Sequence, residues 1–378
     1  MATFFERLRR CVSPDKSFAC LTALFCPVVL TFVGLVALSS ASLSFYRNES
    51  LFSKQLYWFL ISLFFFLIGT FVDLNFIRKH ISKVLIAFFV LLILVLIPGI
   101  GHSVNGSRRW LLIFGMNLQV SEFVKIVLIL WLANYISLAE REIKSFFKGF
   151  FKPFLVAACI SGLVLLEPDY GTAILLGGIA ISLLFLYGSK VLYIGGSLVV
   201  ALVSVSILIF FNPVRMRRVM AFMDIDANRL GGAYQLWQGI LGFVSGGLWG
   251  SGVGNGKQQL VYLPEAHTDF ILPILGEEFG SIAVVFVLIL YFVFFITCIV
   301  HGMRIKSIYY SAVSCGIALL VAYQVVINVG VVSGLLPTKG IVLPFISYGR
   351  SNLLAMYFML GILLNCFLFN QDLPSEIE

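Results

Sequence analysis

Long runs of apolar residues, separated by short polar segments, are the dominant pattern along this chain. A helix needs about 20 apolar residues to cross the core of a bilayer, with a range of about 17–25. By this length rule the pattern predicts ten membrane-spanning helices, at residues 18–41, 55–74, 82–98, 118–137, 152–167, 170–187, 190–211, 271–300, 309–333 and 346–369. The expected fold class is therefore an all-α integral membrane protein of about ten transmembrane helices.

The predicted spans form one membrane domain, residues 18–370, with short polar tails at 1–17 and 371–378. Residues 212–270 form a long polar loop between the seventh and eighth predicted helices. The composition agrees with this class, since 60% of the residues are hydrophobic and 12% are charged, against about 25% charged residues in a soluble domain. The net charge of +8 does not indicate nucleic-acid binding, because basic residues in membrane proteins set orientation and bind anionic head groups.

The positions of Lys and Arg predict which side of the membrane each loop occupies, because short cytoplasmic loops carry an excess of these residues. An even number of spans places both termini on one side. With the termini inside, the internal segments hold fourteen basic residues, namely Arg7, Arg9, Arg10, Lys16, Arg78, Lys79, Lys83, Arg141, Lys144, Lys148, Lys152, Lys190, Arg304 and Lys306. The short external loops hold six, namely Arg47, Lys54, Arg108, Arg109, Lys339 and Arg350. We therefore expect cytoplasmic termini and an extracytoplasmic long loop.

Three ionisable residues near the predicted span ends have both a structural and a functional interpretation. Glu122 and Lys125 interrupt the fourth span and, at spacing i,i+3, share a helix face on which they can pair. Asp169 follows a proline and could cap the next helix, or it could contribute to a substrate or metal site. The sequence leaves these alternatives open.

Basic residues on the predicted outer face also have two interpretations. Arg108 and Arg109, followed by Trp110, could anchor the chain at the membrane interface. They could instead form a phosphate clamp, because guanidinium groups match phosphate geometry with paired donors. Lys339, between a proline and a glycine, could extend along the membrane edge or present a fixed ammonium group to a ligand.

The long loop contains two further patterns. Tyr234, Trp237, Leu241 and Val244 follow helical spacing, which predicts an amphipathic helix on the outer leaflet. The glycine-rich segment 246–257 fits neither the P-loop spacing nor the G-x-G-x-x-G spacing of nucleotide-binding loops. No nucleotide is therefore expected. A hinge or lid is the favoured interpretation of that segment.

The end of the long loop places ionisable groups where a membrane helix begins. Glu265, His267 and Asp269 lie in the run 264–270, directly before the apolar segment that starts at Ile271. Ionisable groups at a membrane edge carry a desolvation cost and are therefore candidates for function. For His267 we expect a local hydrogen bond, since no H-E-x-x-H pattern is present.

Several motifs together resemble the SEDS family (shape, elongation, division and sporulation), and its cell-division branch more than its elongation branch. They are N-G-S-R-R-W at 105–110, Q-V-S-E-F at 119–123, P-D-Y-G-T at 168–172, P-E-A-H-T-D-F at 264–270, G-E-E at 276–278 and P-T-K-G to S-Y-G at 337–349. The resemblance spans essentially all of the membrane region. It implies a ten-helix peptidoglycan glycosyltransferase that polymerises lipid II into glycan strands outside the cytoplasmic membrane, at the division site. Its implied partners are a class B penicillin-binding protein, which is the transpeptidase, and other membrane proteins of the division complex.

The resemblance also implies roles for particular residues. Asp269, in T-D-F, is the implied catalytic residue, a general base for which desolvation would raise the ordinary pKa of about 3.9. The substrate-binding candidates are Arg108, Arg109, Glu122, Lys125, Asp169, Glu265, His267, Glu278, Lys339, Ser347 and Arg350. A divalent cation, Mg²⁺ or Mn²⁺, is a further expectation without assigned ligands.

Two positions depart from the family pattern, and two other functions compete with polymerisation. Arg350 replaces a glycine of S-Y-G-G-S-S, and Val120 stands where proline is common. The Arg350 side chain either disturbs helix packing or adds a phosphate contact. The first competing function is a lipid II flippase, which would need polar residues along a route through the bundle. The second is a non-catalytic scaffold for the penicillin-binding protein.

Overall fold

The computed structural model describes residues 14–41, 51–104, 107–113, 116–256 and 267–368. Within these ranges, nine helices are long and apolar enough to cross a membrane, and Tyr170–Leu186 is a shorter apolar helix. In chain order the ten are α2 (Pro14–Ala41), α3 (Leu51–Phe71), α4 (Leu74–Leu96), α5 (Val120–Leu138), α6 (Lys152–Leu166), α7 (Tyr170–Leu186), α8 (Val191–Phe210), α11 (Ile271–Met303), α12 (Ile308–Val332) and α13 (Arg350–Leu368). The span that contains α6 is 21 residues long, Phe146–Leu166, because a π-helical turn continues into the helix. Each predicted span coincides with one of them, which confirms the all-α membrane class.

Helix α4 begins earlier than hydropathy predicted. Asp73 caps it, because its carboxylate accepts hydrogen bonds from the backbone N–H groups of Asn75 and Phe76. The first turns carry Arg78 and Lys79, so the apolar run starts only after the helix is under way. A π-helical turn, Phe146–Phe151, similarly precedes α6.

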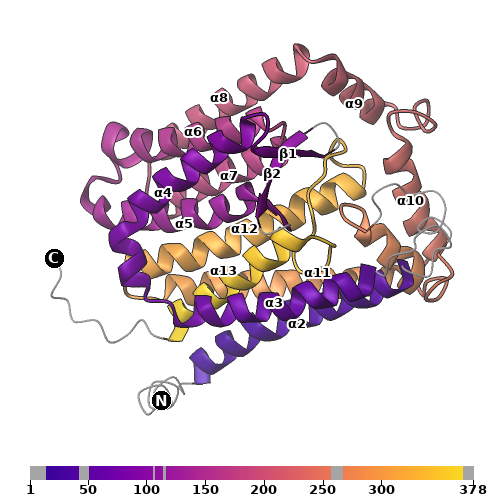
Figure 1. The fold of residues 1–378 in the computed structure, drawn as a ribbon, viewed down its shortest axis with the longest axis horizontal. Coiled ribbons are helices and arrows are strands. Elements are labelled where there is room, and N and C mark those ends of the chain that lie inside the picture. Colours follow the sequence, from indigo (N-terminus) through magenta and orange to yellow (C-terminus); the bar gives the residue numbers. More distant parts are fainter. Residues whose placement is uncertain (1–13, 42–50, 105–106, 114–115, 257–266, 369–378) are drawn as a thin grey trace.

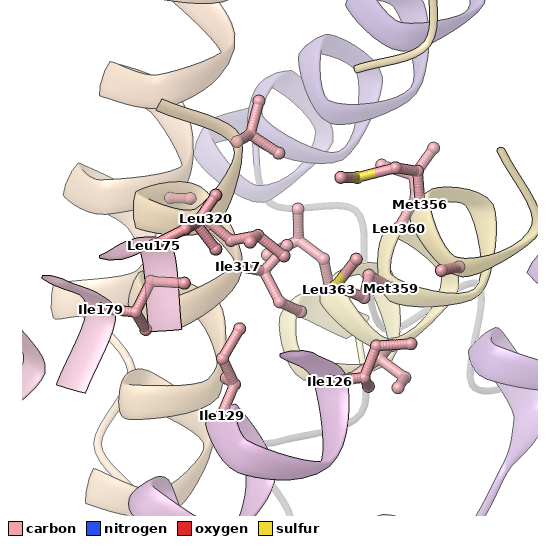
Figure 2. Close-up of a cluster of buried hydrophobic side chains, with 14 of the residues drawn as sticks. Ile126, Ile129, Leu175, Ile179, Ile317, Leu320, Met356, Met359, Leu360 and Leu363 are labelled. Atoms are coloured by element: carbon pink, nitrogen blue, oxygen red, sulfur yellow. The ribbon is translucent and has the colours of Figure 1, made fainter. Parts of the chain in front are cut away.

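Helix α13 is the centre of the bundle. It packs against α2, α3, α5 and α12 and is buried along almost its whole length. Figure 2 shows the apolar core where α5, α7, α12 and α13 meet, with labelled side chains Ile126, Ile129, Leu175, Ile179, Ile317, Leu320, Met356, Met359, Leu360 and Leu363. Lipid is as apolar as these side chains, so van der Waals packing rather than hydrophobicity stabilises the contact.

The crossing of α3 and α13 depends on two glycines. A Cβ atom on Gly361 would collide with the carbonyl oxygen of Phe66, and one on Gly69 would collide with that of Phe358. Small residues at a crossing allow two helix backbones to approach closely within a membrane. By contrast, α8 lies at the edge of the bundle beside α7 and α9 (Pro213–Met223), and nearly all of its described side chains are exposed.

A small antiparallel sheet, which the sequence analysis did not predict, connects α4 and α5. Its strands are β1 (Gly101–Val104), β2 (Ser107–Ile113) and β3 (Met116–Gln119), in the order β1-β2-β3. In Figure 1 the sheet, α9 and α10 (Tyr234–Gly246) lie at the end of the bundle opposite to where α2 begins and α13 ends. The sheet and the two helices of the long loop are therefore at the same end.

The helix predicted in the long loop is present as α10, but it buries a different face from the apolar stripe. Its buried residues are Leu236, Gly239, Gly242 and Gly246, and they pack on α11. A Cβ atom on Gly246 would collide with the carbonyl oxygen of Gly276. The glycines therefore set how closely α10 approaches α11, while Val244 of the predicted stripe is exposed.

The glycine-rich segment after α10 is hydrogen-bonded into a break in α11. Gly280 has φ 81° and ψ 176° inside this helix, a conformation that glycine adopts without steric cost. The break frees two carbonyl groups of α11, and the backbone N–H groups of Ser251 and Gly252 donate to the carbonyls of Glu277 and Glu278 at 2.8 and 3.0 Å. This geometry is that of a docked segment rather than of a hinge or lid.

Candidate active site

Two segments that are distant in sequence meet at Asp269. This residue lies in the turn before α11, and a Cβ atom built on Gly340 would be 2.5 Å from its Oδ2 atom. The carboxylate is therefore packed against the backbone that follows Lys339. The side-chain amide of Asn328, on α12, donates hydrogen bonds to the carbonyl oxygens of both Asp269 and Ile341.

Lys339 lies over the aromatic ring of Tyr170, with Nζ 5.2 Å from the ring centroid. Burial lowers the pKa of the Lys339 ammonium group to about 7, and the positive charge of Arg109 adds to this effect, while the carboxylate of Asp169 opposes it. The ammonium group is thus poorly solvated and close to several charges. A bound anion would restore its charged form.

The side chain of Asp169 has two functions that the sequence analysis treated as alternatives. It caps α7 by accepting hydrogen bonds from the backbone N–H and the hydroxyl of Thr172 at 3.2 and 2.9 Å. Its Oδ2 atom also lies 3.9 Å from Nη1 of Arg109 and 3.4 Å from Nε2 of Gln119. The capping hydrogen bonds therefore hold the Asp169 carboxylate close to Arg109 and Gln119.

Arg109 connects the sheet to the turn between α6 and α7. Its Nε donates to the carbonyl of Glu167 at 3.0 Å, and its Nη2 donates to the carbonyl of Pro168 at 2.7 Å. Arg108, the preceding residue of β2, is exposed, and the pairing of β1 with β2 is irregular at these two arginines. Of the two arginines of the expected phosphate clamp, the structure places only Arg109 beside Asp169.

Glu167 is a residue of this region that the candidate set missed. Its side chain is fully buried, and neither carboxyl oxygen has a hydrogen-bond partner among the described residues. Burial and, after it, the neighbouring Asp169 carboxylate raise the pKa of Glu167 to about 8, against the opposing effect of Arg109. The group is therefore a neutral carboxylic acid over most of the physiological range.

The candidate set also missed two arginines of the long loop. The guanidinium carbon of Arg215, on α9, lies 3.9 Å from the centroid of the Tyr170 ring. The charges of Arg215 and Arg218 both lower the pKa of Lys339. Their spacing, i,i+3 on a short helix, was a signal that both could face the same group. We call Arg109, Arg215, Arg218 and Lys339 the cation cluster.

Glu122 and Lys125 form a buried ion pair inside the bundle. Nζ of Lys125 lies 2.8 Å from Oε2 of Glu122, and the side-chain amide of Asn352 donates to the same oxygen at 2.8 Å. Removing one partner of such a pair would leave an uncompensated buried charge. The geometry favours the structural interpretation of these two residues.

Three other candidates hold the loop that follows Lys339. The backbone carbonyl of His267 accepts from the N–H of Tyr348 at 2.9 Å, and their rings are 5.6 Å apart. The hydroxyl of Ser347 accepts from the N–H of Leu343 at 2.8 Å. Nε of Arg350 donates to the Tyr348 hydroxyl at 3.4 Å. Arg350 starts α13 and is half-buried there.

The remaining candidates lie elsewhere or outside the described residues. Glu278 is buried in α11, where its Oε1 atom accepts from the hydroxyl of Ser40 and from the backbone N–H of Gly254. Glu265 is outside the described residues. Across the ranges that the structure describes, no group of three or more His, Cys, Asp or Glu side chains is placed to hold a metal ion. A divalent cation can also bind through one or two carboxylates together with substrate phosphates, so the expected Mg²⁺ or Mn²⁺ stays a prediction.

Comparison with known proteins gives one family over almost the whole chain. The model of the FtsW/RodA/SpoVE family, described as cell cycle protein, matches residues 20–371. The chain is 36% identical to a probable peptidoglycan glycosyltransferase FtsW of Francisella salina, over 99% of this chain and 94% of that protein. It is 38% identical to the probable peptidoglycan glycosyltransferase FtsW of Coxiella burnetii, over 90% and 93% of the two proteins.

Solved structures share the fold. A chain from a peptidoglycan synthase complex that coordinates polymerization and crosslinking superposes with a TM-score of 0.76, at 24% identity, covering 91% of this chain and 96% of that chain. The rod shape determining protein RodA of Thermus thermophilus superposes with a TM-score of 0.70, at 23% identity, covering 93% and 98%. At these identities the similarity establishes the arrangement of the helices.

Proposed function

The chain belongs to the FtsW/RodA/SpoVE family, and we propose from this premise that it is a peptidoglycan glycosyltransferase, as its relatives are named. It joins lipid II units into glycan strands on the outer face of the cytoplasmic membrane during cell division. The observation that best supports this activity is the contact of the Asp269 carboxylate with the backbone of Gly340, beside Lys339 of the cation cluster.

The chemistry needs one base and a stabilised leaving group. The 4-hydroxyl oxygen of the acceptor sugar attacks the anomeric carbon of the donor, so that a glycosidic C–O bond forms while the C–O bond to the lipid diphosphate breaks. Asp269 takes the hydroxyl proton. A positioned general base of this kind contributes about 10²–10⁴-fold in rate. A diphosphate leaves without prior protonation, so a second carboxylic acid is not required.

The cation cluster is suited to stabilise the departing diphosphate. Arg109 is fixed by two backbone carbonyls, and Arg215 and Lys339 both lie at the Tyr170 ring. Guanidinium groups bind phosphate oxygens with paired donors, and preorganised positive groups lower the barrier most where charge develops. The diphosphate charge also favours the protonated form of Lys339.

The excess of basic residues in the loops assigned to the inside supports cytoplasmic termini, with Asp269 and the cation cluster outside. A structural neighbour from a complex that coordinates polymerization and crosslinking supports a partnership with a crosslinking enzyme. We therefore expect a class B penicillin-binding protein as the partner, within the division complex.

The test is polymerisation of labelled lipid II by the full chain with its penicillin-binding protein. Asp269→Asn should reduce polymer formation by about 10²-fold or more, with the complex and its thermal unfolding unchanged. Asp226→Asn is the matched control, since Asp226 is an exposed acid of the same loop, and it should polymerise normally. Normal polymerisation by Asp269→Asn would exclude the base assignment. Translocation of lipid II in vesicles without any polymer would support the flippase instead.

A further inference from the structure

One side-chain amide bridges the two segments that meet at Asp269. Asn328 lies in the last turns of α12 and is 2% exposed. Its Nδ2 atom donates to the carbonyl oxygen of Asp269 at 2.9 Å and to that of Ile341 at 2.7 Å. An amide NH₂ group has two donors, and here each is directed to a different segment.

The two bridged segments carry the groups that the proposed reaction needs. Asp269 lies in a turn, and Lys339 to Ile341 have no regular secondary structure. A backbone hydrogen bond from Tyr348 to His267 joins the two segments to each other, and Asn328 joins both of them to α12, a long and largely buried helix. Asn328 therefore attaches both segments to one rigid helix.

The other polar atom of this amide argues against a role in stability alone. Oδ1 of Asn328 is buried and has no hydrogen-bond partner within the described structure. A buried acceptor without a partner is unfavourable, and an apolar side chain of similar size would avoid that cost. The amide at this position is explained by its two donor bonds.

We propose that Asn328 is a positioning residue, which sets the separation between the Asp269 carboxylate and the Lys339 ammonium group. This inference rests on the proposed glycosyltransferase activity. When the two bonds are lost, the turn and the loop lose their common attachment to α12, and the hydrogen bond from Tyr348 to the carbonyl of His267 is the backbone link that remains described between them. A displacement of about 1 Å at reacting groups can cost about 10²-fold in rate. Binding of lipid II is affected less, because Arg109 and Arg215 are held by other elements.

The experiment compares two variants at Asn328 with a matched control. Asn328→Asp keeps the shape of the side chain but removes the NH₂ group, and Asn328→Ala removes the side chain. Gln324→Ala is the control, because Gln324 lies one turn earlier on α12, is also 2% exposed, and also has an amide oxygen without a partner in the described residues. It makes no hydrogen bond to either segment there.

Two quantities are measured on the full chain with its penicillin-binding protein. Both Asn328 variants should lower kcat for lipid II polymerisation by about tenfold or more, with KM changed less than about twofold. Hydrogen exchange in the peptide covering residues 334–348 should become faster in both variants. Gln324→Ala should leave kcat, KM and this exchange close to wild type.

The exchange measurement separates this inference from the proposed function. Unchanged exchange in both Asn328 variants would overturn the bridging role, whether or not the wild type polymerises lipid II. Faster exchange with an effect on KM alone, or an equal loss of kcat in Gln324→Ala, would overturn the positioning role. A wild type without polymerase activity would refute the proposed function and, with it, the positioning of that reaction.

Discussion

Gly340 contacts the Asp269 carboxylate so closely that a methyl group at position 340 would lie 2.5 Å from Oδ2. The backbone of Gly340 is not in the left-handed region, where a side chain would be strained in any surroundings. Glycine is required at this position to leave room for a carboxylate, and not to form a turn. The contact therefore connects the P-T-K-G motif directly to the implied base.

The variant Gly340→Ala tests this connection. The added methyl group must displace the Asp269 carboxylate, so kcat/KM for lipid II polymerisation should fall about 10- to 100-fold, with little change in Tm. Gly178→Ala is the control, because a Cβ atom there would lie 3.7 Å from the Tyr323 ring, an ordinary contact. Wild-type activity in Gly340→Ala would show that the carboxylate does not act from its present position.

The pKa of about 7 for Lys339 predicts a pH dependence of activity. In the free protein the ammonium group loses its proton as the pH rises through this value, so kcat/KM should decline above about pH 7. In the complex, the diphosphate favours the charged form, so the decline in kcat should occur at higher pH. Steady-state rates measured from about pH 6 to pH 9 give both profiles.

Lys339→Arg provides the check on that assignment. A guanidinium group stays charged throughout this range, so the decline in kcat/KM should disappear even if the absolute rate is lower. A decline that persists at the same pH in Lys339→Arg would assign it to another group.

Glu167 predicts a pH dependence of stability. Its pKa of about 8 in the folded protein exceeds the ordinary value of 4.5, so the folded state binds more protons between these values. This proton binding stabilises the folded state fully below pH 4.5. The stabilisation is lost as the pH rises to about 8, at up to about 1.4 kcal/mol per pH unit.

In Glu167→Gln this contribution is absent. Between about pH 5 and pH 8, the Tm of the wild type should fall relative to that of Glu167→Gln. Glu140→Gln is the control, since Glu140 is exposed in a short 3-10 turn, and its Tm should follow the wild type. A constant difference between wild type and Glu167→Gln across this range would mean that Glu167 is ionised in the folded protein.

The two neighbouring arginines should differ in importance. Arg109 belongs to the cation cluster and makes two hydrogen bonds to backbone carbonyls, while Arg108 is exposed. Arg109→Ala should lower kcat/KM by about 10- to 100-fold, the value of a charge-assisted contact or two. The loss of kcat/KM in Arg108→Ala should be at least about tenfold smaller. Equal losses of kcat/KM in the two variants would indicate that both arginines bind substrate.

The membrane fold was predictable from the sequence because each span is a continuous apolar run. Even the fourth span, which contains two charges, was identified, and the i,i+3 spacing of Glu122 and Lys125 allowed the pairing that the structure has. Hydropathy did not predict the sheet, since its strands are short, lie between glycines and carry two adjacent arginines. It also could not show which face of α10 is buried, because close glycine packing has no hydrophobic signal.

The candidate site was predictable only in part. The motifs identified Asp269, Asp169, Arg109 and Lys339, which the structure brings to one end of the bundle. The contact between Asp269 and Gly340 is long-range and leaves no local pattern. Arg215 and Arg218 lie in the long loop, where basic residues give little information on topology, and no motif includes them.

The break at Gly280 makes the folding of a membrane span depend on the long polar loop. In lipid, every backbone polar group must find a partner, and the carbonyls of Glu277 and Glu278 find theirs in Ser251 and Gly252. Insertion of α11 alone would leave these carbonyls unpaired, so docking of the glycine-rich segment and completion of the helix form one cooperative unit. The sequence places residues 247–256 in a polar loop outside the bilayer. Their hydrogen bonds to α11 nevertheless make them part of the folded membrane domain.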